Sequence, residues 1–403
     1  MRSAANVLLA RKNCQPDANR GPFQMSPAAD PTANPIYARL GVPTFINARG
    51  TITTLGGSVM PVEVVEAMAA ASRSFVPLGE LHEKVGARIA RLTGAPAAFV
   101  CAGAASGMLL SGAACLTGTD NDAIANLPDT GDRPNQFIIS LVDGHFYVHQ
   151  GFRVCGGELI RVGSRQAVTT ADYENAINEH TAAIVFFLGS QPLEQLQEVV
   201  GVAHERGVPV IVDAAAQLPP KSNLTDLSTT VGADLVVFSG GKGLFGPQSS
   251  GLILGRQDLV QAAAMNSNPH SGVGRAQKVG KEEIVGLLRA VELFMEADEA
   301  DTVAEWERRC QVVGAVADDI RGLRADYTAA YQNRFPPASP LVHLRFADDA
   351  PGTARDVVQA LEEGEPAIMA SASDSSLTIG PQTLQDGEAE IIAERLRAIL
   401  QAL

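Results

Sequence analysis

Short apolar runs alternate with amphipathic segments through the middle of the chain. The runs at 183–188, 208–213 and 233–238 are almost continuously hydrophobic, which is typical of strands that are buried on both faces. Between them, segment 193–206 carries apolar residues at spacings of three and four, which predicts a helix. Strands that alternate with helices predict an α/β fold with a mainly parallel sheet.

The same pattern divides the chain into three parts. Residues 1–34 are rich in Pro, Ala, Asn and Asp without periodicity, which predicts a disordered leader, with Met25 as an alternative start. Residues 35–280 contain the strand–helix alternation and predict a large domain. Residues 281–403 begin with two long amphipathic helices, and we expect them to form a small α+β domain.

Composition limits the function classes. With 46% hydrophobic and 19% charged residues, the chain has the balance of a globular protein. Its net charge of −14 argues against a broad nucleic-acid-binding surface, which needs basic patches. No apolar run approaches the roughly 18 residues of a membrane span. The five cysteines show no paired spacing, so no metal site or disulfide framework is predicted. We expect a cytoplasmic protein that binds neither nucleic acid nor membrane.

One lysine follows the end of a predicted strand. Lys242 comes after the apolar run 233–238 and lies within the glycine-rich segment 239–251. Glycine lets other groups approach the backbone closely. A lysine of lowered pKa at such a place could form a Schiff base with a carbonyl compound or with pyridoxal phosphate. The alternative is a surface lysine in a flexible turn.

Three further features lie at strand ends, where open parallel sheets bind ligands. Asp213 ends one apolar run, and His145 follows another. The turn 102–107, made of small residues, leads into a helix whose first amide groups would hold a phosphate. The alternatives are a turn aspartate, a structural histidine and close helix packing by small residues.

Together these features match the requirements of pyridoxal phosphate, which needs a lysine, a carboxylate at the pyridine nitrogen, a phosphate cup and a group flat against the ring. Lys242 would be the Schiff-base lysine and the acid/base at the substrate α-carbon. Asp213 would face the pyridine nitrogen, and His145 would lie against the ring. The other predicted cofactor contacts are Gly103, Ala104, Ala105 and Ser239 at the phosphate, and Gln217 at the phenolic oxygen.

Three sequence blocks resemble a known family. They are VDAAAQLPP (212–220), FSGGKG with GPQSSG (238–251) and GRAQKVGKEEI (274–284). Together they are similar to the SelA-like (selenocysteine synthase-like) branch of fold-type I pyridoxal-phosphate enzymes, which includes D-glucosaminate-6-phosphate ammonia-lyase. The resemblance implies a large domain with a mainly parallel, seven-stranded sheet and a small C-terminal α+β domain.

The resemblance also implies a homodimer or a larger homo-oligomer with active sites between subunits. Gln248 and Ser249 would then contact the cofactor phosphate of a neighbouring subunit. The N-terminal segment 35–60 would enter the active site, with Asn47 and Arg49 as candidate substrate contacts. Arg275 is a further candidate, because a guanidinium can bind a carboxylate or phosphate through two hydrogen bonds. Surface or interface ion pairs are the alternative for these residues.

Two positions depart from the family pattern. Gln217 stands where many relatives carry glutamate, and 146–149 differs from the usual Arg-Asn-Pro-Tyr. We therefore expect an altered environment around the ring and substrate. The predicted activity is an ammonia-releasing α,β-elimination of a small polar or anionic amino acid, through an external aldimine and an α-carbanion. A racemase or aminotransferase is the alternative, followed by a selenium transferase or a cofactor-binding protein without catalysis.

Overall fold

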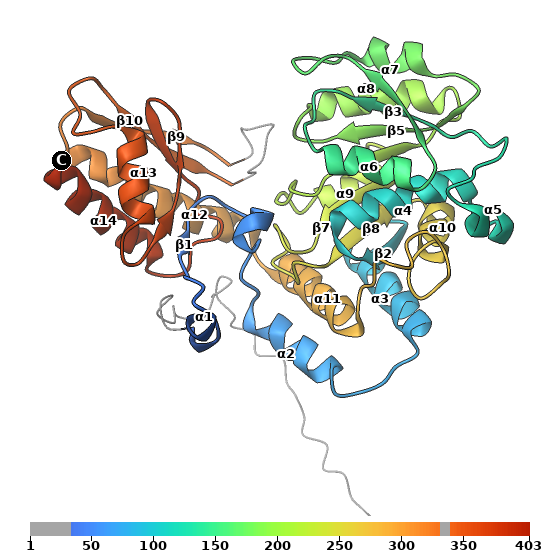
Figure 1. Cartoon of the computed structure of the whole chain (residues 1–403), viewed down its shortest axis with the longest axis horizontal. Helices are drawn as coiled ribbons and strands as arrows, with labels where there is room; N and C mark the ends of the chain where they lie inside the picture. Colours follow the sequence, from blue (N-terminus) through green and yellow to red (C-terminus); the bar gives the residue numbers. More distant parts are fainter. Residues whose placement is uncertain (1–33, 331–338) are drawn as a thin grey trace, which may run out of the picture.

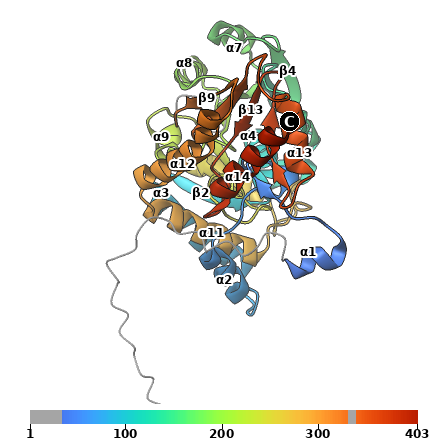
Figure 2. The ribbon, with the colours of Figure 1, turned by 90° about the vertical axis from the view of Figure 1, so that its left-hand side faces the viewer.

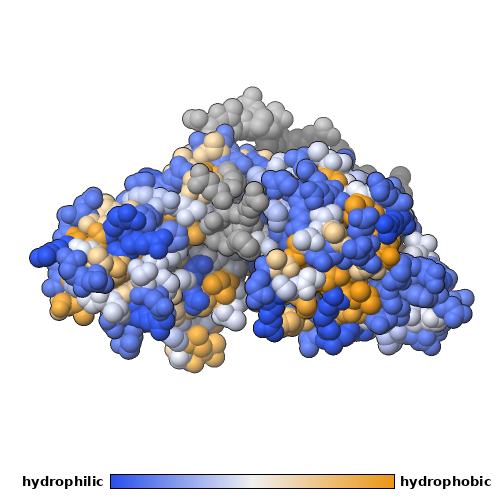
Figure 3. Space-filling view, turned by 90° about the horizontal axis from the view of Figure 1, so that it is seen from above, coloured by the Kyte–Doolittle hydropathy of each residue, from blue (hydrophilic) through white to orange (hydrophobic). Residues whose placement is uncertain are grey.

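The structure, a computed structural model, describes residues 34–330 and 339–403. Apart from Asn34, the predicted leader lies outside the described residues. Figure 1 shows a large lobe around a seven-stranded sheet and a small lobe around a four-stranded sheet. No helix in either described range is long and apolar enough to cross a membrane. The molecular face in Figure 3 is mostly hydrophilic, with hydrophobic residues scattered over both lobes.

The large sheet has the strand order β2-β8-β7-β6-β5-β3-β4. β8 (Gly251–Gly255) runs antiparallel to both of its neighbours, and all other adjacent pairs are parallel. The remaining strands are β2 (Ala97–Cys101), β3 (Gln136–Ser140), β4 (Glu158–Val162), β5 (Thr181–Phe187), β6 (Val210–Asp213) and β7 (Leu235–Ser239). The prediction of a mainly parallel, seven-stranded sheet is confirmed.

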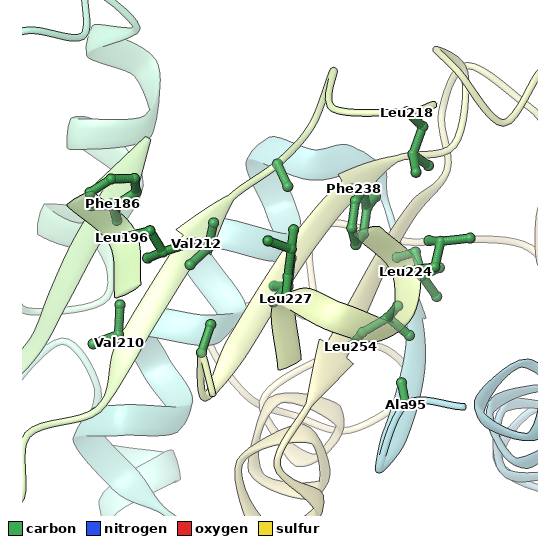
Figure 4. Packing of buried hydrophobic residues seen from close by; sticks show 14 of the residues in the cluster. Ala95, Phe186, Leu196, Val210, Val212, Leu218, Leu224, Leu227, Phe238 and Leu254 are labelled. Atoms are coloured by element: carbon green, nitrogen blue, oxygen red, sulfur yellow. The ribbon is translucent and has the colours of Figure 1, made fainter. Parts of the chain in front are cut away.

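Both faces of this sheet are buried, which explains why its strands are continuously hydrophobic. Val210 and Val212 of β6 point into one core cluster, whereas Ile211 belongs to the other. Figure 4 shows the first cluster, where helix residues such as Leu196 and Leu227 pack over the strands. The helices on this face are α3 (Leu78–Thr93), α7 (Thr170–Ala176), α8 (Leu193–His204), α9 (Asn223–Thr229) and α11 (Lys281–Glu296). The helices on the opposite face are α4 (Gly103–Thr117), α6 (Phe146–Val154) and α10 (Gln257–Met265).

The small lobe combines the end of the chain with a short N-terminal segment. Its sheet has the order β12-β13-β10-β9, and α12, α13 and α14 contribute to its core (Figure 2). β1 (Ile46–Asn47) pairs with β11 (Ile368–Met369), which brings Ile46 and Ala48 into the same core. The elements are β9 (Leu323–Thr328), β10 (Leu341–Phe346), β12 (Ser371–Ala372), β13 (Ser376–Ile379), α12 (Glu299–Gly314), α13 (Ala354–Glu362) and α14 (Glu388–Ala402).

The division into two domains stays a prediction, but the packing favours a boundary after α11. Ile284, Leu287 and Val291 of this helix belong to the core of the large sheet. The chain leaves the helix at Ala297 and enters α12 after Asp298, whose side chain caps that helix. We therefore place the proposed boundary near Ala297 rather than at residue 281.

Some element boundaries differ from the pattern in the sequence. The pattern predicts a helix over 173–180, but the corresponding helix α7 runs from Thr170 to Ala176. Thr169 and Asp172 form a capping box, which accounts for its earlier start. The second long C-terminal helix ends at Gly314 and continues as a short 3-10 turn. The helices α1 (Pro35–Leu40), α2 (Val62–Ala71) and α5 (Asn121–Asn126) complete the large lobe and its N-terminal approach.

Candidate active site

The carboxyl ends of the parallel strands meet at one edge of the large sheet. Cys101 at the end of β2 and Ser239 at the end of β7 both pair with Gly251 of β8. The turn after β2 and the turn after β7 therefore lie two strand spacings apart, roughly 10 Å. Asp213 ends β6, the neighbour of β7. The fold thus brings the predicted lysine, carboxylate and phosphate-binding turn to the same edge.

The turn that carries Lys242 is closed by backbone hydrogen bonds and by glycines. Gly240 donates to the Ser250 carbonyl over 2.9 Å, and Gly246 donates to the Gly240 carbonyl over 2.8 Å. A Cβ atom on Gly241 would lie 2.4 Å from Gln248 Cα, and one on Gly243 would lie 2.4 Å from the Leu218 carbonyl oxygen. Larger residues would open this turn, so the glycines fix the backbone on both sides of the lysine.

Lys242 and Asp213 carry opposite charges that influence each other, but the two side chains form no ion pair or hydrogen bond with each other. Burial lowers the pKa of Lys242, and the Asp213 charge partly offsets this. Burial raises the pKa of Asp213, whereas a hydrogen bond from the Ala215 amide and the Lys242 charge lower it. Among residues 34–330 and 339–403, the Lys242 amine makes no ion pair or hydrogen bond. Its nitrogen is therefore available to a ligand placed beside Asp213.

His145 is held by an aspartate for which the sequence pattern gave no role. Its Nδ1 atom and its backbone N–H both lie 2.6 Å from Asp143 Oδ1. Ser190, which follows β5, donates to Asp143 Oδ2 over 2.8 Å. The pKa of His145 is raised, first by the hydrogen bond to Asp143, and the Asp213 charge acts in the same direction. His145 therefore shares one electrostatic neighbourhood with Asp213 and Lys242.

The first turn of α4 is free to bind an anion. No side chain of the described residues caps this helix, and no acidic residue lies in its first turn. An added Cβ at Gly103 would meet open space, whereas one at Gly251 would lie 2.4 Å from the Gly103 carbonyl carbon. Ser106 in this turn donates to Gln277 Oε1 over 2.6 Å. The first turn of α4 thus presents the amide groups of Gly103, Ala104 and Ala105. It lies against the start of β8, where Gly251 has no side chain.

The remaining predicted cofactor contacts occupy different environments. Gln217 is half-buried in the loop after β6, where its carbonyl accepts from Asn223 over 2.7 Å. Gln248 and Ser249 are exposed. Gln248 donates to the Thr53 carbonyl over 2.9 Å, so it ties the N-terminal segment to the lysine turn. Exposure of Gln248 and Ser249 is compatible with contact to another subunit, which stays a prediction.

The N-terminal segment runs from the small lobe to the lysine turn. Thr383 donates to the Asn47 carbonyl over 2.6 Å, and Ser58 donates to the Gly241 carbonyl over 3.1 Å. The Asn47 side chain donates to the Gly50 carbonyl within a local turn. The Arg49 side chain is exposed and makes no hydrogen bond or ion pair with another described residue. This segment therefore carries a guanidinium that has no partner among the residues that the structure describes.

Arg275 lies in the loop that contacts the α4 turn. Its side chain is exposed and has no hydrogen-bond or ion-pair partner in the described ranges. Two residues away, Gln277 accepts the Ser106 bond. Asp143, Ser190 and Gln277 are the site residues that the sequence analysis missed. Asp143 stands two positions before His145, which was a usable signal, whereas Ser190 and Gln277 are brought in only by folding.

These residues fit pyridoxal phosphate. Lys242 would take its carbonyl group, Asp213 its ring nitrogen and the first turn of α4 its phosphate. The fit rests on an uncapped helix start, a glycine that leaves room beneath it and an unpaired, partly buried amine beside a carboxylate. Within the described ranges, no group of three or more His, Cys, Asp or Glu side chains is arranged to hold a metal ion.

Known proteins share this sequence and fold. The family described as "SelA: L-seryl-tRNA selenium transferase" matches residues 45–307. A D-glucosaminate-6-phosphate ammonia lyase from Salmonella typhimurium is 33% identical over 379 residues, which cover 91% of this chain and 98% of the relative. A 5'-C-glycyluridine monooxygenase-decarboxylase from a Streptomyces species is 35% identical over 298 residues, 72% of each chain.

A solved structure gives the same result. The structure of a D-glucosaminate-6-phosphate ammonia-lyase superposes with a TM-score of 0.76 at 31% identity. The match covers 92% of this chain and 99% of that one. The prediction of the fold-type I architecture is confirmed by these likenesses.

Proposed function

The chain belongs to the L-seryl-tRNA selenium transferase (SelA) family, and we propose that its site binds pyridoxal 5'-phosphate through Lys242. The resemblance to the SelA-like branch is thereby confirmed. The chain is an enzyme of the pyridoxal-phosphate-dependent lyase type, similar to an ammonia-lyase. The assignment of individual residues to cofactor and substrate is our proposal.

One observation carries the proposal most directly. The amine of Lys242 is partly buried, has no bonded partner among the described residues and lies in the field of the half-buried Asp213 carboxylate. A structural lysine at such a place would be expected to close an ion pair, because an unpaired buried charge is costly. An amine kept apart from its counter-charge, with a lowered pKa, is suited to react with a carbonyl group.

Each residue then has a defined role. Pyridoxal phosphate, when bound, supplies an electron-withdrawing ring that stabilises negative charge on the substrate α-carbon. Asp213 would keep a proton on the ring nitrogen, and the amides of Gly103, Ala104 and Ala105 would hold the phosphate. The Lys242 amine would take the α-proton from the substrate. His145 would lie against the ring and present its Nε2 atom to the substrate.

The proposed substrate is a small polar or anionic amino acid. The unpaired guanidinium groups of Arg49 and Arg275 support an anionic group on it. The ammonia-lyase relative is named for D-glucosaminate 6-phosphate, a phosphorylated amino-sugar acid. The altered sequence at 146–149 leads us to propose a different acid for this chain. We further propose a homodimer or larger assembly, with Gln248 and Ser249 near a neighbouring subunit, in the cytoplasm.

The first experiment tests the cofactor. Purified protein is incubated with pyridoxal phosphate, reduced with borohydride and digested, and the peptides are weighed by mass spectrometry. We expect the cofactor mass on the peptide that contains Lys242. Lys242→Ala should lose the adduct, whereas Lys278→Ala, which removes an exposed lysine, should retain it. A wild-type protein that takes up no cofactor would refute the proposal.

The second experiment identifies the reaction. The cofactor-loaded enzyme is incubated with D- and L-amino acids and with amino-sugar acids, with and without phosphate groups. Equal amounts of keto acid and ammonia are expected from a lyase. Inversion at the α-carbon without ammonia would support a racemase, and transfer of the amino group to an added keto acid would support an aminotransferase. Either of these two results would contradict the proposed elimination.

A further inference from the structure

Asp143 bonds both the backbone and the imidazole ring of His145, the residue that precedes α6. Asp143 Oδ1 accepts two hydrogen bonds of 2.6 Å, one from the His145 backbone N–H and one from its Nδ1 atom. The backbone bond alone would order the start of α6. The imidazole bond adds a second restraint, because it fixes which ring nitrogen faces the protein.

We propose that Asp143 and Ser190 are positioning residues that hold the His145 ring by Nδ1 and leave Nε2 to donate a proton to the substrate's leaving group. This inference rests on the proposed function, since it assigns a second proton-transfer group to the same reaction. Nε2 has no hydrogen-bond partner among the described residues. The His145 side chain is 57% exposed, whereas that of Asp143 is only 4% exposed.

Asp143 is itself held by a residue of the loop that follows β5. Ser190 donates to its Oδ2 atom over 2.8 Å, so both carboxylate oxygens have partners. The neighbouring Gln191 is 3% exposed and accepts a hydrogen bond of 2.7 Å from the Tyr173 hydroxyl. The loop after β5 is therefore anchored in the core by Gln191. Through Ser190 it orients the Asp143 carboxylate, and that carboxylate orients the His145 imidazole.

The charges around His145 favour its protonated form. The hydrogen bond to Asp143 is the largest influence and raises its pKa, and the charges of Asp143 and Asp213 act in the same direction. Burial and the Lys242 charge oppose this shift but do not reverse it. The pKa of Asp143 is lowered: burial alone would raise it, but the bonds from His145 and Ser190 outweigh burial. Both shifts therefore favour an imidazolium beside a carboxylate.

In the proposed elimination, each bond that breaks is matched by a bond that forms. When the α-proton passes to Lys242, its bonding pair forms the double bond between the α- and β-carbons. The bond from the β-carbon to its leaving oxygen breaks, and that electron pair goes to the oxygen. The proton on His145 Nε2 then passes to the oxygen, so that a hydroxyl group leaves as water. Lys242 then releases the α-proton to solvent and the neutral imidazole takes one up, so no net proton is gained or lost. Asp143 keeps its orientation throughout.

The test measures His145 directly. Histidine ring signals are followed by NMR against pH, in the protein with and without pyridoxal phosphate, and His145 is assigned with His145→Gln. Asp143→Asn is expected to lower the His145 pKa by about one unit. Ser190→Ala should lower it by less, in the same direction. Asp374→Asn removes a surface charge whose side chain is 92% exposed, and should leave the titration unchanged.

Kinetic measurements show whether Asp143 positions His145 for the reaction or only supports the fold. With an amino acid that the wild type converts to keto acid, Asp143→Asn should reduce kcat by about 10- to 100-fold while KM changes little. The alkaline limb of the kcat profile should move to lower pH, because the proton donor is lost earlier. His145→Gln should cost as much as Asp143→Asn, and the double variant should cost no more than either.

An unchanged His145 titration in Asp143→Asn would overturn the inference. If that variant does not fold, Ser190→Ala decides, and an unchanged titration there overturns it as well. Equal losses that add fully in the double variant would also contradict it. If the wild type binds no cofactor, the proposed function fails, but the NMR titration still reports whether Asp143 sets the state of His145.

Discussion

At the scale of single residues, burial is the largest influence on the pKa values of Lys242 and Asp213. Lys242 and Asp213 are each shifted towards the neutral form by burial, and each is shifted back by the other's charge. Removing the charge of one residue should therefore shift the pKa of the other. The same reasoning applies to the buried His82, where no opposite charge offsets the effect of burial on the pKa.

The first prediction concerns Asp213→Asn. Because a nearby negative charge stabilises an ammonium, its removal should lower the Lys242 pKa further, by about one unit. In protein without cofactor, the rate at which an amine reagent labels Lys242 should then rise at lower pH than in the wild type. Labelling is followed by the mass of the Lys242 peptide. The remote Asp374→Asn should match the wild type, and an unshifted profile in Asp213→Asn would contradict the coupling.

The second prediction concerns acid stability. His82 is 8% exposed, stacks on Phe99 at 4.8 Å and has no partner for either ring nitrogen in the described ranges. Burial, with a smaller effect of the His270 charge, lowers its pKa from 6.5 to about 4. Between these values the unfolded chain binds the proton and the folded chain does not, so stability falls as the pH falls from 6.5 towards 4.

His82→Phe keeps an aromatic ring on Phe99 and removes this titration. Between pH 7 and pH 4.5, the wild type should lose about 2 kcal/mol more unfolding free energy than the variant. Urea denaturation at the two pH values measures the difference. His180→Asn, at a histidine whose side chain is 65% exposed, serves as the control. Equal acid losses in the wild type and His82→Phe would show that His82 is not the cause.

At the scale of elements, close approach of backbones shapes the site. β8 begins with Gly251 directly beneath the first turn of α4, and a Cβ there would lie 2.8 Å from the Ala104 nitrogen. The start of α4 is therefore positioned by the absence of a side chain on a neighbouring strand. Sequence spacing within 102–107 could not reveal this contact, because its partner is far along the chain.

The third prediction compares two glycines. Gly251→Ala should destabilise the fold by about 1–3 kcal/mol and weaken cofactor binding, because the first turn of α4 must move. Gly201→Ala on α8 adds a methyl group with nothing within 4 Å, and should stabilise by about 0.5–1 kcal/mol. Urea denaturation and cofactor titration measure both variants. A stable, tightly binding Gly251→Ala protein would contradict the proposed cup.

At the scale of the whole molecule, one lysine links the active-site loop to the connection between the lobes. The Lys221 amine donates to the Met295 carbonyl over 3.2 Å and to the Ala297 carbonyl at the end of α11. Its backbone N–H donates to Glu299 in the first turn of α12 over 2.6 Å. The loop that begins at Asp213 is thereby attached to the junction that leads into the small lobe.

The fourth prediction is that Lys221→Ala loosens this junction. Losing a cation at the carbonyl end of α11 should make hydrogen exchange at residues 295–300 about 10-fold faster, a cost of roughly 1.4 kcal/mol. Lys84→Ala, which removes an exposed lysine on α3, should leave this exchange unchanged. Mass spectrometry of exchanged peptides makes the measurement. Exchange that is the same in all three proteins would show that Lys221 does not secure the connection.

The sequence by itself determined the sheet, its strand ends and the positions of Lys242, Asp213 and His145 on them, because buried strands and turns are encoded by neighbouring residues. It misplaced the ends of α7 and did not reveal the short helix α5, because local preferences for helix and loop are nearly equal there. Only the tertiary structure joined Asp143 to Ser190, 47 residues away, and Ser106 to Gln277, 171 residues away. Such contacts have no local pattern, because they form only when distant segments are packed together.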